Sequence, residues 1–168
     1  GQCPDGSAVL ASLRRNRLIR QVLDLGMPPG DFALAGSAPL YAHGLRSRLR
    51  DVDVVARGAA WKIAQTFGKP VEAPSGIGHV VRIGDGEIEI FDRWVAPKWP
   101  IGKLIDGAEV IDGIRVVSLR DSLAWKRYLN REKDAADIRL LERYFSTEDA
   151  QYEQVPAYSG GAATKSKV

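Results

Sequence analysis

Apolar residues recur along the chain at spacings that alternate between those of helices and those of strands. A helical stripe over residues 7–25 predicts a first helix, and a bounded apolar run at 32–35 predicts a buried strand. A short helix over 38–43, a second strand at 52–56 and a helix at 59–67 are expected next. The order of these elements is helix, strand, helix, strand, helix.

Two hairpins are predicted after this segment. Residues 79–83 and 87–91 alternate between apolar and polar side chains and flank Gly84-Asp85-Gly86, which is a strong turn signal. Residues 108–117 predict a second hairpin that turns at Asp112-Gly113. The hairpins indicate that part of the sheet is antiparallel.

The C-terminal part of the chain is predicted to be helical from residue 119 to about 145, with a break near Asn130. The whole pattern indicates an α+β fold in which helices flank a mixed sheet. We expect a core over residues 1–118, a helical segment over 119–150 packed on it, and a flexible tail over 151–168, whose small and polar residues bury little surface.

Composition adds few constraints. The 168 residues are 45% hydrophobic and 27% charged, with a net charge of +3, which is typical of a globular domain and permits an anionic partner. The single cysteine, Cys3, excludes an internal disulfide, and no apolar run reaches the length needed to cross a bilayer. A cytoplasmic location without membrane association is therefore the default expectation.

An acidic pair at the second strand is the first candidate for chemistry. Asp51 and Asp53 are alternate residues, so their side chains share one face of the strand, with Cα atoms about 6.5–7 Å apart. Two carboxylates so placed can bind hard divalent cations such as Mg²⁺. Without a cation, buried carboxylates repel each other. An Asp-x-Asp pair also occurs at ordinary strand edges, and that alternative remains open.

Gly36 and Ser37 stand between the first strand and the following helix. A glycine there lets the backbone approach a ligand closely, and a helix N-terminus with a serine hydroxyl suits an anion. The alternative is an ordinary strand-to-helix turn in which Ser37 caps the helix.

A third carboxylate is expected from a neighbouring strand. Glu87 and Glu89 share a face of the 87–91 strand, and Asp92 follows it. A site for two metal ions needs such an acid. Glu89 is preferred, with Glu87 and Asp92 as further candidates, although paired acids are also common on the solvated face of an antiparallel sheet.

These motifs together resemble the nucleotidyltransferase signature of the DNA polymerase β-like superfamily, and they are most similar to its AbiEii-type branch. The resemblance lies in the run from Leu34-Ala35-Gly36-Ser37 to His43-Gly44-Leu45-Arg46, in Arg50-Asp51-Val52-Asp53, in Val116-Val117-Ser118-Leu119 with Trp125-Lys126, and in Arg131-Glu132-Lys133-Asp134 with Asp137-Ile138. It covers roughly residues 30–145. Ser37 replaces the second glycine usual in this branch, and the third acid is a glutamate.

The resemblance implies transfer of a nucleoside monophosphate from an NTP to an acceptor hydroxyl, with release of pyrophosphate. It implies a nucleotidyltransferase-like fold and Mg²⁺ or Mn²⁺ as cofactor. The catalytic residues it implies are Asp51, Asp53, Glu89, Lys126 and Asp137, of which Asp51, Asp53 and Glu89 hold the metal. The nucleotide-binding residues are Gly36, Ser37, Arg46, Arg50, Lys126 and Lys133.

The C-terminal motif also has a geometric interpretation. In one unbroken helix over 119–140, Lys126, Asn130, Lys133 and Asp137 share a stripe that presents two cations and an acid to a cleft. The alternative is a solvated face with a Lys133–Asp137 pair.

Three functions remain open at this point. The first is a toxin-type transferase with RNA or tRNA as acceptor and a cognate antitoxin as partner; arginines at 14–20 and 46–50 would then face the acceptor. The second is a transferase for a small molecule such as an antibiotic. The third is a catalytically weak nucleotide-binding or protein-interaction module. Trp94 and Trp99 are expected in the core, or as a wall for a nucleobase.

Overall fold

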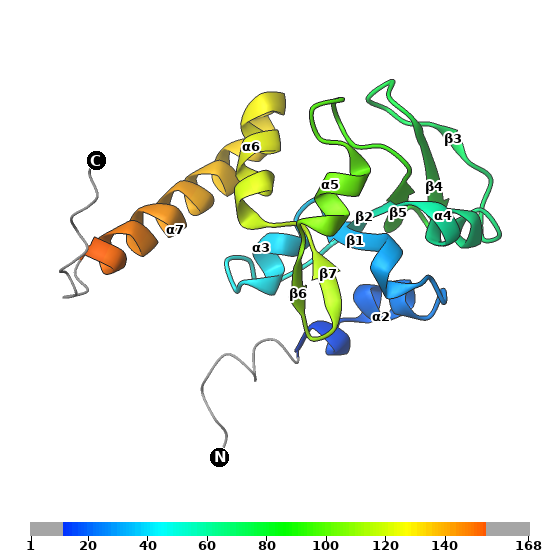
Figure 1. Ribbon diagram of the computed structural model, residues 1–168, viewed down its shortest axis with the longest axis horizontal. Coiled ribbons are helices and arrows are strands. Elements are labelled where there is room, and N and C mark those ends of the chain that lie inside the picture. The colour runs from blue at the N-terminus through cyan, green and yellow to red at the C-terminus, as the bar shows by residue number, and fades with distance from the viewer. Residues whose placement is uncertain (1–11, 154–168) are drawn as a thin grey trace, which may run out of the picture. The chain divides into compact units, whose positions relative to one another are not determined.

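The computed structural model describes residues 12–153 (Figure 1). The chain divides into two compact units, one ending at Trp125 and one beginning at Lys126. The first unit contains the helices η1 (Ser12–Arg15), α2 (Arg17–Leu23), η2 (Pro29–Asp31), α3 (Ala38–Ala42), α4 (Gly58–Ala64) and α5 (Ile101–Asp106). Its strands are β1 (Phe32–Ala35), β2 (Val52–Ala56), β3 (Val71–Glu72), β4 (His79–Ile83), β5 (Ile88–Phe91), β6 (Glu109–Ile111) and β7 (Ile114–Val116).

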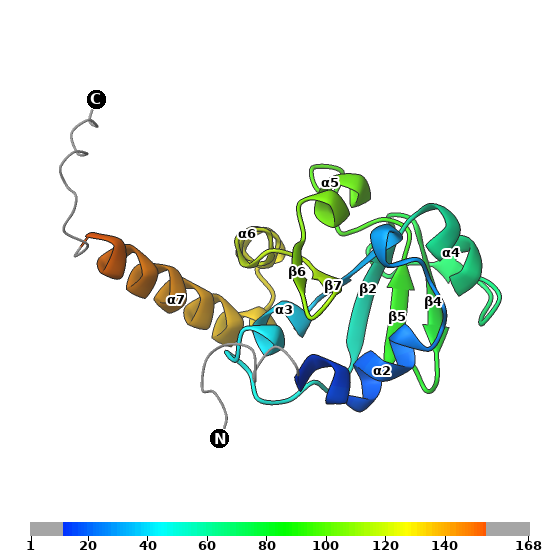
Figure 2. The same ribbon diagram turned by 60° about the horizontal axis from the view of Figure 1, so that its bottom comes forward.

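The seven strands form one sheet in the order β3-β4-β5-β2-β1-β7-β6. β2 runs parallel to β5 and β1 parallel to β7, whereas the other neighbouring pairs are antiparallel. Figure 2 shows β2, β5 and β4 side by side in this sheet. The prediction of an α+β fold with a mixed sheet is confirmed. None of the helices within residues 12–153 combines the length and apolar character that a bilayer span requires.

One face of the sheet builds the main hydrophobic core. Alternate residues of each strand point to this face. They are joined by buried side chains of η1, α2, α3 and α4. The strand residues are Phe32, Leu34, Val52, Val54, Val81, Ile88, Ile90, Ile114 and Val116; the helix residues are Leu13, Leu18, Ile19, Val22, Ala38, Ala42, Ala60 and Ala64. The alternation of apolar residues in the sequence therefore predicted correctly which strand residues face the core.

The opposite face is apolar at one end only. The strand pairing places Ala33, Val55, Phe91 and Val80 in one row across β1, β2, β5 and β4. The Trp94 ring packs edge-on against Phe91, with ring centroids 5.3 Å apart. The next row toward the other end of this face is polar, and it contains the candidate acids.

Helix α5 is fixed to the sheet by Arg57, which stands between β2 and α4. The guanidinium donates hydrogen bonds to Asp106 Oδ1 at 2.8 Å and to the Gly30 carbonyl at 3.0 Å. The hydrogen bond to Asp106 raises the pKa of Arg57 despite the opposing effect of burial, and it lowers the pKa of Asp106. Arg57 thereby holds three segments of the first unit together.

Several predicted boundaries need correction. The helix expected over 7–25 is interrupted at Asn16, whose side-chain oxygen accepts from the Leu18 and Ile19 amides and caps α2; residues 7–11 lie outside the described part. Helix α4 ends at Ala64 rather than at residue 67. The short elements β3 and α5 were not predicted. Both predicted hairpins are present.

In the C-terminal part, α6 (Leu119–Leu129) is followed by η3 (Glu132–Asp134) and α7 (Ala135–Glu153). The predicted break is confirmed at Asn130, which adopts a positive φ of 48°. Asparagine tolerates this left-handed conformation better than most residues, and it ends the helix there. The predicted tail begins too early, because α7 continues to Glu153. Residues 154–168 lie outside the described part.

Candidate active site

Two of the predicted acids are neighbours across the sheet. Asp53 on β2 and Glu89 on the parallel strand β5 are register partners, so their side chains point to the same face. Neighbouring strands lie about 4.8 Å apart, so the two side chains start from adjacent positions on this face. Asp53 is half-buried, as is Glu89. The pairing of distant segments 52–56 and 88–91 creates this juxtaposition.

Gly36 completes one side of this carboxylate pair. It follows Ala35, which is the register partner of Asp53 on β1, and it is buried with a φ of 63°. A Cβ atom at position 36 would collide with Asp53 Oδ2 and lie 3.0 Å from Asp53 Cγ. Only glycine therefore lets the Asp53 carboxylate rest against the backbone here.

Ser37 stands at the N-cap position of α3, yet its side chain makes no capping hydrogen bond. The expectation that α3 offers an anion a complete helix N-terminus is only partly met. The helix has five residues, and Pro39 in its first turn has no N–H to donate. What remains for a ligand is the Ser37 hydroxyl and the backbone around Gly36.

Glu89 is held from its other side by Arg82 of β4. These residues are antiparallel register partners, and Arg82 Nε donates to Glu89 Oε2 at 2.6 Å. The row across the sheet thus runs Ala35, Asp53, Glu89, Arg82. Arg82 was not singled out from the sequence. A three-residue turn at 84–86 would place Ile88 opposite it, whereas the strands are joined by the four residues 84–87, which places Glu89 there.

Asp51 lies just before β2 and is exposed. Continuing the parallel register by one residue places it beside Glu87, whose carbonyl accepts from the Val52 amide at 2.7 Å. Glu87 is itself 3.4 Å from Arg17 of α2. Asp51 and Glu87 therefore form the outer, solvated edge of the acidic face.

The acids at this site do not form a complete metal cage. Within residues 12–153, no three His, Cys, Asp or Glu residues are arranged to hold a metal ion by themselves. Mg²⁺ does not need such a cage, because it is commonly bound through one or two carboxylates, with substrate phosphates and water in the remaining positions. Asp53 and Glu89 supply oxygen ligands of that kind, so their chemistry fits Mg²⁺ or Mn²⁺.

The remaining candidates of the first unit lie on segments other than β2 and β5. Arg46 and Arg50 are exposed on the segment between α3 and β2, which leads directly to Asp51. Asp92 is engaged elsewhere, since its Oδ1 accepts from the His79 amide at 2.7 Å. Asp92 therefore caps the start of β4, and Glu89 is the acid that faces Asp53.

In the second unit, the side chains of Lys126 and Asp137 form an ion pair. Lys126 Nζ lies 3.2 Å from Asp137 Oδ2, and both residues are only 3% exposed. The predicted stripe on one unbroken helix is wrong, because the chain turns at Asn130. The alternative Lys133–Asp137 pair is also not what forms: Lys133 is exposed, and Lys126 is the partner of Asp137.

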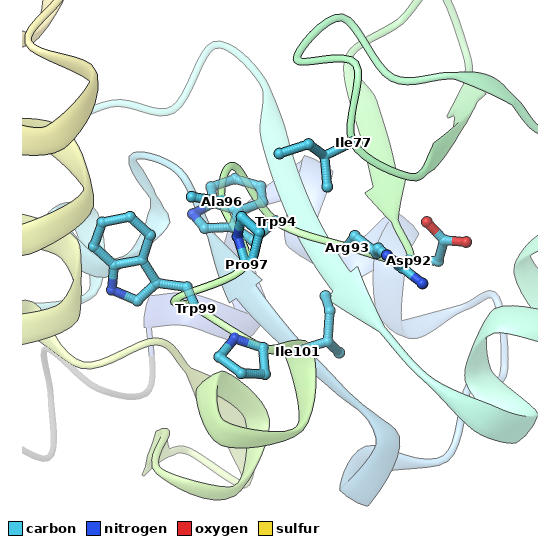
Figure 3. A pocket seen from close by; sticks show the side chains of 9 residues that line it. Ile77, Asp92, Arg93, Trp94, Ala96, Pro97, Trp99 and Ile101 are labelled. Carbon is cyan, nitrogen blue, oxygen red and sulfur yellow. The ribbon is translucent and has the colours of Figure 1, made fainter.

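A pocket of about 320 Å³ lies beside the loop that follows β5 (Figure 3). In Figure 3, the Trp94 and Trp99 rings and Pro97 lie on one side of it and Asp92 on the other. Both tryptophans are more than nine-tenths buried, so the expectation that they belong to the core is confirmed. Little ring surface is left to serve as a wall for a nucleobase.

Comparisons with protein families, with curated proteins and with solved structures find no match to this chain. The interpretation of the site therefore rests on its own residues and on the motifs in the sequence.

Proposed function

We propose that this protein is a metal-dependent nucleotidyltransferase that transfers a nucleoside monophosphate from an NTP to an acceptor hydroxyl. The observation that carries the proposal is the pairing of Asp53 with Glu89 across two parallel strands, directly against the backbone of Gly36. The resemblance of the Gly36-Ser37 and Asp51-to-Asp53 motifs to nucleotidyltransferases adds to it.

The electrostatics of the pair support a role in binding. Two carboxylates placed side by side repel each other, and this repulsion disfavours folding. Arg82 offsets part of the charge of Glu89, and a divalent cation between the two carboxylates would attract both. Glycine at position 36 serves the same arrangement, because any side chain there would displace the Asp53 carboxylate.

The roles of the residues follow from their positions. Asp53 and Glu89 would hold Mg²⁺ or Mn²⁺, with Asp51 at the exposed edge as a further ligand. The cation, when bound, supplies neutralisation of phosphate charge and activation of the acceptor hydroxyl. The Ser37 hydroxyl and the backbone at Gly36 would position the phosphates, which matters because phosphoryl transfer depends chiefly on positioning and charge stabilisation.

The acceptor is proposed to be RNA, with tRNA as one form of it. The exposed residues Arg46, Arg48 and Arg50 lead to Asp51, and Arg17 lies beside Glu87, so arginines from two distant segments border the acidic face. Guanidinium groups are well suited to bind phosphates. A cognate antitoxin, as in toxin–antitoxin systems, remains part of this proposal.

The decisive experiment is incubation of the full chain with each α-labelled NTP, Mg²⁺ and total RNA. We expect labelled RNA with the wild type, and a loss of about a hundredfold or more with Asp53→Asn, which keeps the size of the side chain but removes the charge. The matched control is Glu72→Gln on β3, which removes an exposed acid from the same unit. Its labelling should equal that of the wild type.

The outcomes separate the alternatives. Labelling that survives in Asp53→Asn would refute the proposed site. If RNA stays unlabelled but a small hydroxylated acceptor, such as an aminoglycoside, becomes labelled, the chemistry stands and the acceptor is corrected. If no acceptor is labelled although the cation and NTP bind, the protein is a nucleotide-binding module.

A further inference from the structure

We propose that Arg82 is a resident counter-ion of Glu89, and that it sets how tightly the Asp53–Glu89 pair takes up a divalent cation. This inference rests on the proposed function, because it concerns the same cation site. It assigns a role to a residue that no part of the nucleotidyltransferase signature contains. Arg82 is a positioning residue here, since it acts on the cation through Glu89.

The geometry of the contact is fixed by strand pairing. Arg82 and Glu89 face each other across the β4–β5 hairpin, and Arg82 Nε lies 2.6 Å from Glu89 Oε2. A guanidinium that binds one carboxylate oxygen leaves the other oxygen for a second ligand. Glu89 therefore stands between a cation of its own chain on one side and Asp53 on the other.

The charges of this row explain why a counter-ion belongs there. Asp53, Glu89 and Arg82 occupy neighbouring strands in one line, with two negative charges and one positive. Arg82 offsets part of the negative charge of Glu89 when no metal ion is bound. An arriving cation must share Glu89 with the guanidinium or displace it.

The ion pair between Arg82 and Glu89 is also weak enough for a divalent ion to displace it. The side chains of Arg82 and Glu89 are 43% and 27% exposed, and ion pairs so close to solvent contribute little to stability. A divalent ion can therefore compete for Glu89. A purely structural cross-strand pair is the alternative role, and it predicts an effect on unfolding with none on cation affinity.

The test measures Mn²⁺ binding to the full chain by the loss of the electron paramagnetic resonance signal of free Mn²⁺. Arg82→Gln removes the positive charge and releases Glu89, so the Kd for Mn²⁺ should fall roughly threefold to thirtyfold, the range expected for one charge several ångströms away. Arg82→Lys keeps the charge and should stay within about twofold of the wild type. The matched control, Lys62→Gln, removes one exposed charge from α4 on the opposite face and should leave the Kd unchanged.

A double-mutant cycle shows whether the effect passes through Glu89. If Arg82 acts by occupying Glu89, the change caused by Arg82→Gln should be several times smaller in a Glu89→Gln background. Two results would overturn the proposal. One is that Arg82→Gln changes the Kd equally in the wild-type and Glu89→Gln backgrounds; the other is that Arg82→Gln leaves the Kd for Mn²⁺ unchanged or raises it.

The failure of this inference can be told from the failure of the proposed function. Asp53→Asn must weaken Mn²⁺ binding if the cation site exists at all. If Asp53→Asn weakens binding while Arg82→Gln leaves it unchanged, the site stands and only the role of Arg82 is refuted. If Asp53→Asn has no effect, the cation site itself is wrong, and the role of Arg82 falls with it.

Discussion

In the first compact unit Asp53 lies beside another carboxylate, whereas in the second unit Asp137 lies beside a lysine. Asp53 and Glu89 are strand neighbours at the half-buried end of a sheet face. Asp137 is almost fully buried and pairs with Lys126 at 3.2 Å. The sequence motifs placed all four residues in one catalytic group, yet the structure gives them two different electrostatic environments.

The difference separates a binding arrangement from a folding arrangement. Neighbouring carboxylates repel each other, and this repulsion favours the uptake of a cation. A buried carboxylate beside a buried ammonium has its charge balanced within the protein. Asp137 is thus balanced by a buried lysine, whereas Glu89 pairs with Arg82 near solvent and has Asp53 as its neighbour on the adjacent strand.

The largest effect on stability should come from breaking the buried pair. Lys126→Ala leaves Asp137 buried without the ammonium, which should lower the free energy of unfolding by about 3–5 kcal/mol. Urea denaturation followed by circular dichroism measures this loss. Replacing both partners by apolar residues, as Lys126→Met with Asp137→Leu, should recover most of the loss, because neither charge then remains buried.

The opposite results would contradict the distinction between the Lys126–Asp137 pair and the Asp53–Glu89 pair. A small effect of Lys126→Ala on unfolding, combined with a large loss of nucleotide transfer in the double variant while it stays folded, would return Lys126 and Asp137 to the active site. Asp53→Asn provides the contrast, since it should lower RNA labelling about a hundredfold while the chain stays folded.

The second largest effect is expected at Gly36. Gly36→Ala forces alanine into a positive φ of 63°, which costs about 1–2 kcal/mol, and its Cβ also pushes the Asp53 carboxylate out of place. We expect a moderate loss of stability and a nearly complete loss of Mn²⁺ binding and RNA labelling.

Gly44→Ala is the matched control for this variant. Gly44 has a φ of 75°, but a Cβ there would meet nothing within 4 Å. The Gly44→Ala variant should therefore have the same backbone strain as Gly36→Ala but still bind the cation. If both variants bind Mn²⁺ equally well, the packing of Gly36 against Asp53 has no functional role.

Sequence patterns located the strands and the acids but not the partners of those acids. The alternation of Val52 to Ala56 and of Ile88 to Phe91 predicted two strands whose acids face one side. It did not predict that β2 and β5 are parallel neighbours, because strand order depends on contacts between distant segments. The Asp53–Glu89 pairing therefore could be postulated from the motif, but its register could not be derived.

The C-terminal helical segment shows a different limit of prediction from the sequence. The break near Asn130 was predicted, yet the motif was interpreted on an unbroken helix, which placed Lys126 and Asp137 on one stripe. With the break included, two helices meet through these side chains. Helix α5 was missed because Pro100 precedes it and Gly102 lies within it, and both residues normally indicate a loop.

The smallest effect in this comparison is a pH dependence at Asp134 in the second unit. Burial alone would raise the pKa of Asp134, but hydrogen bonds from the side chain and backbone of Arg131, with the charges of Arg131 and Lys126, lower it overall. The folded chain thus binds fewer protons at this carboxyl than the unfolded chain does. Its contribution to stability is complete above the ordinary carboxyl pKa of about 3.9 and is lost as the pH falls through the lower, folded value.

The urea midpoint of the wild type should therefore decrease below pH 4, and Asp134→Asn should make this decrease shallower. Arg131→Gln should do the same, because it removes the largest group that lowers the pKa. Equal slopes in the wild type and both variants would show that Asp134 does not gain stability from its ionised form. In that case the contrast between the buried, paired acids of the second unit and the neighbouring acids of the first would rest on Lys126 and Asp137 alone.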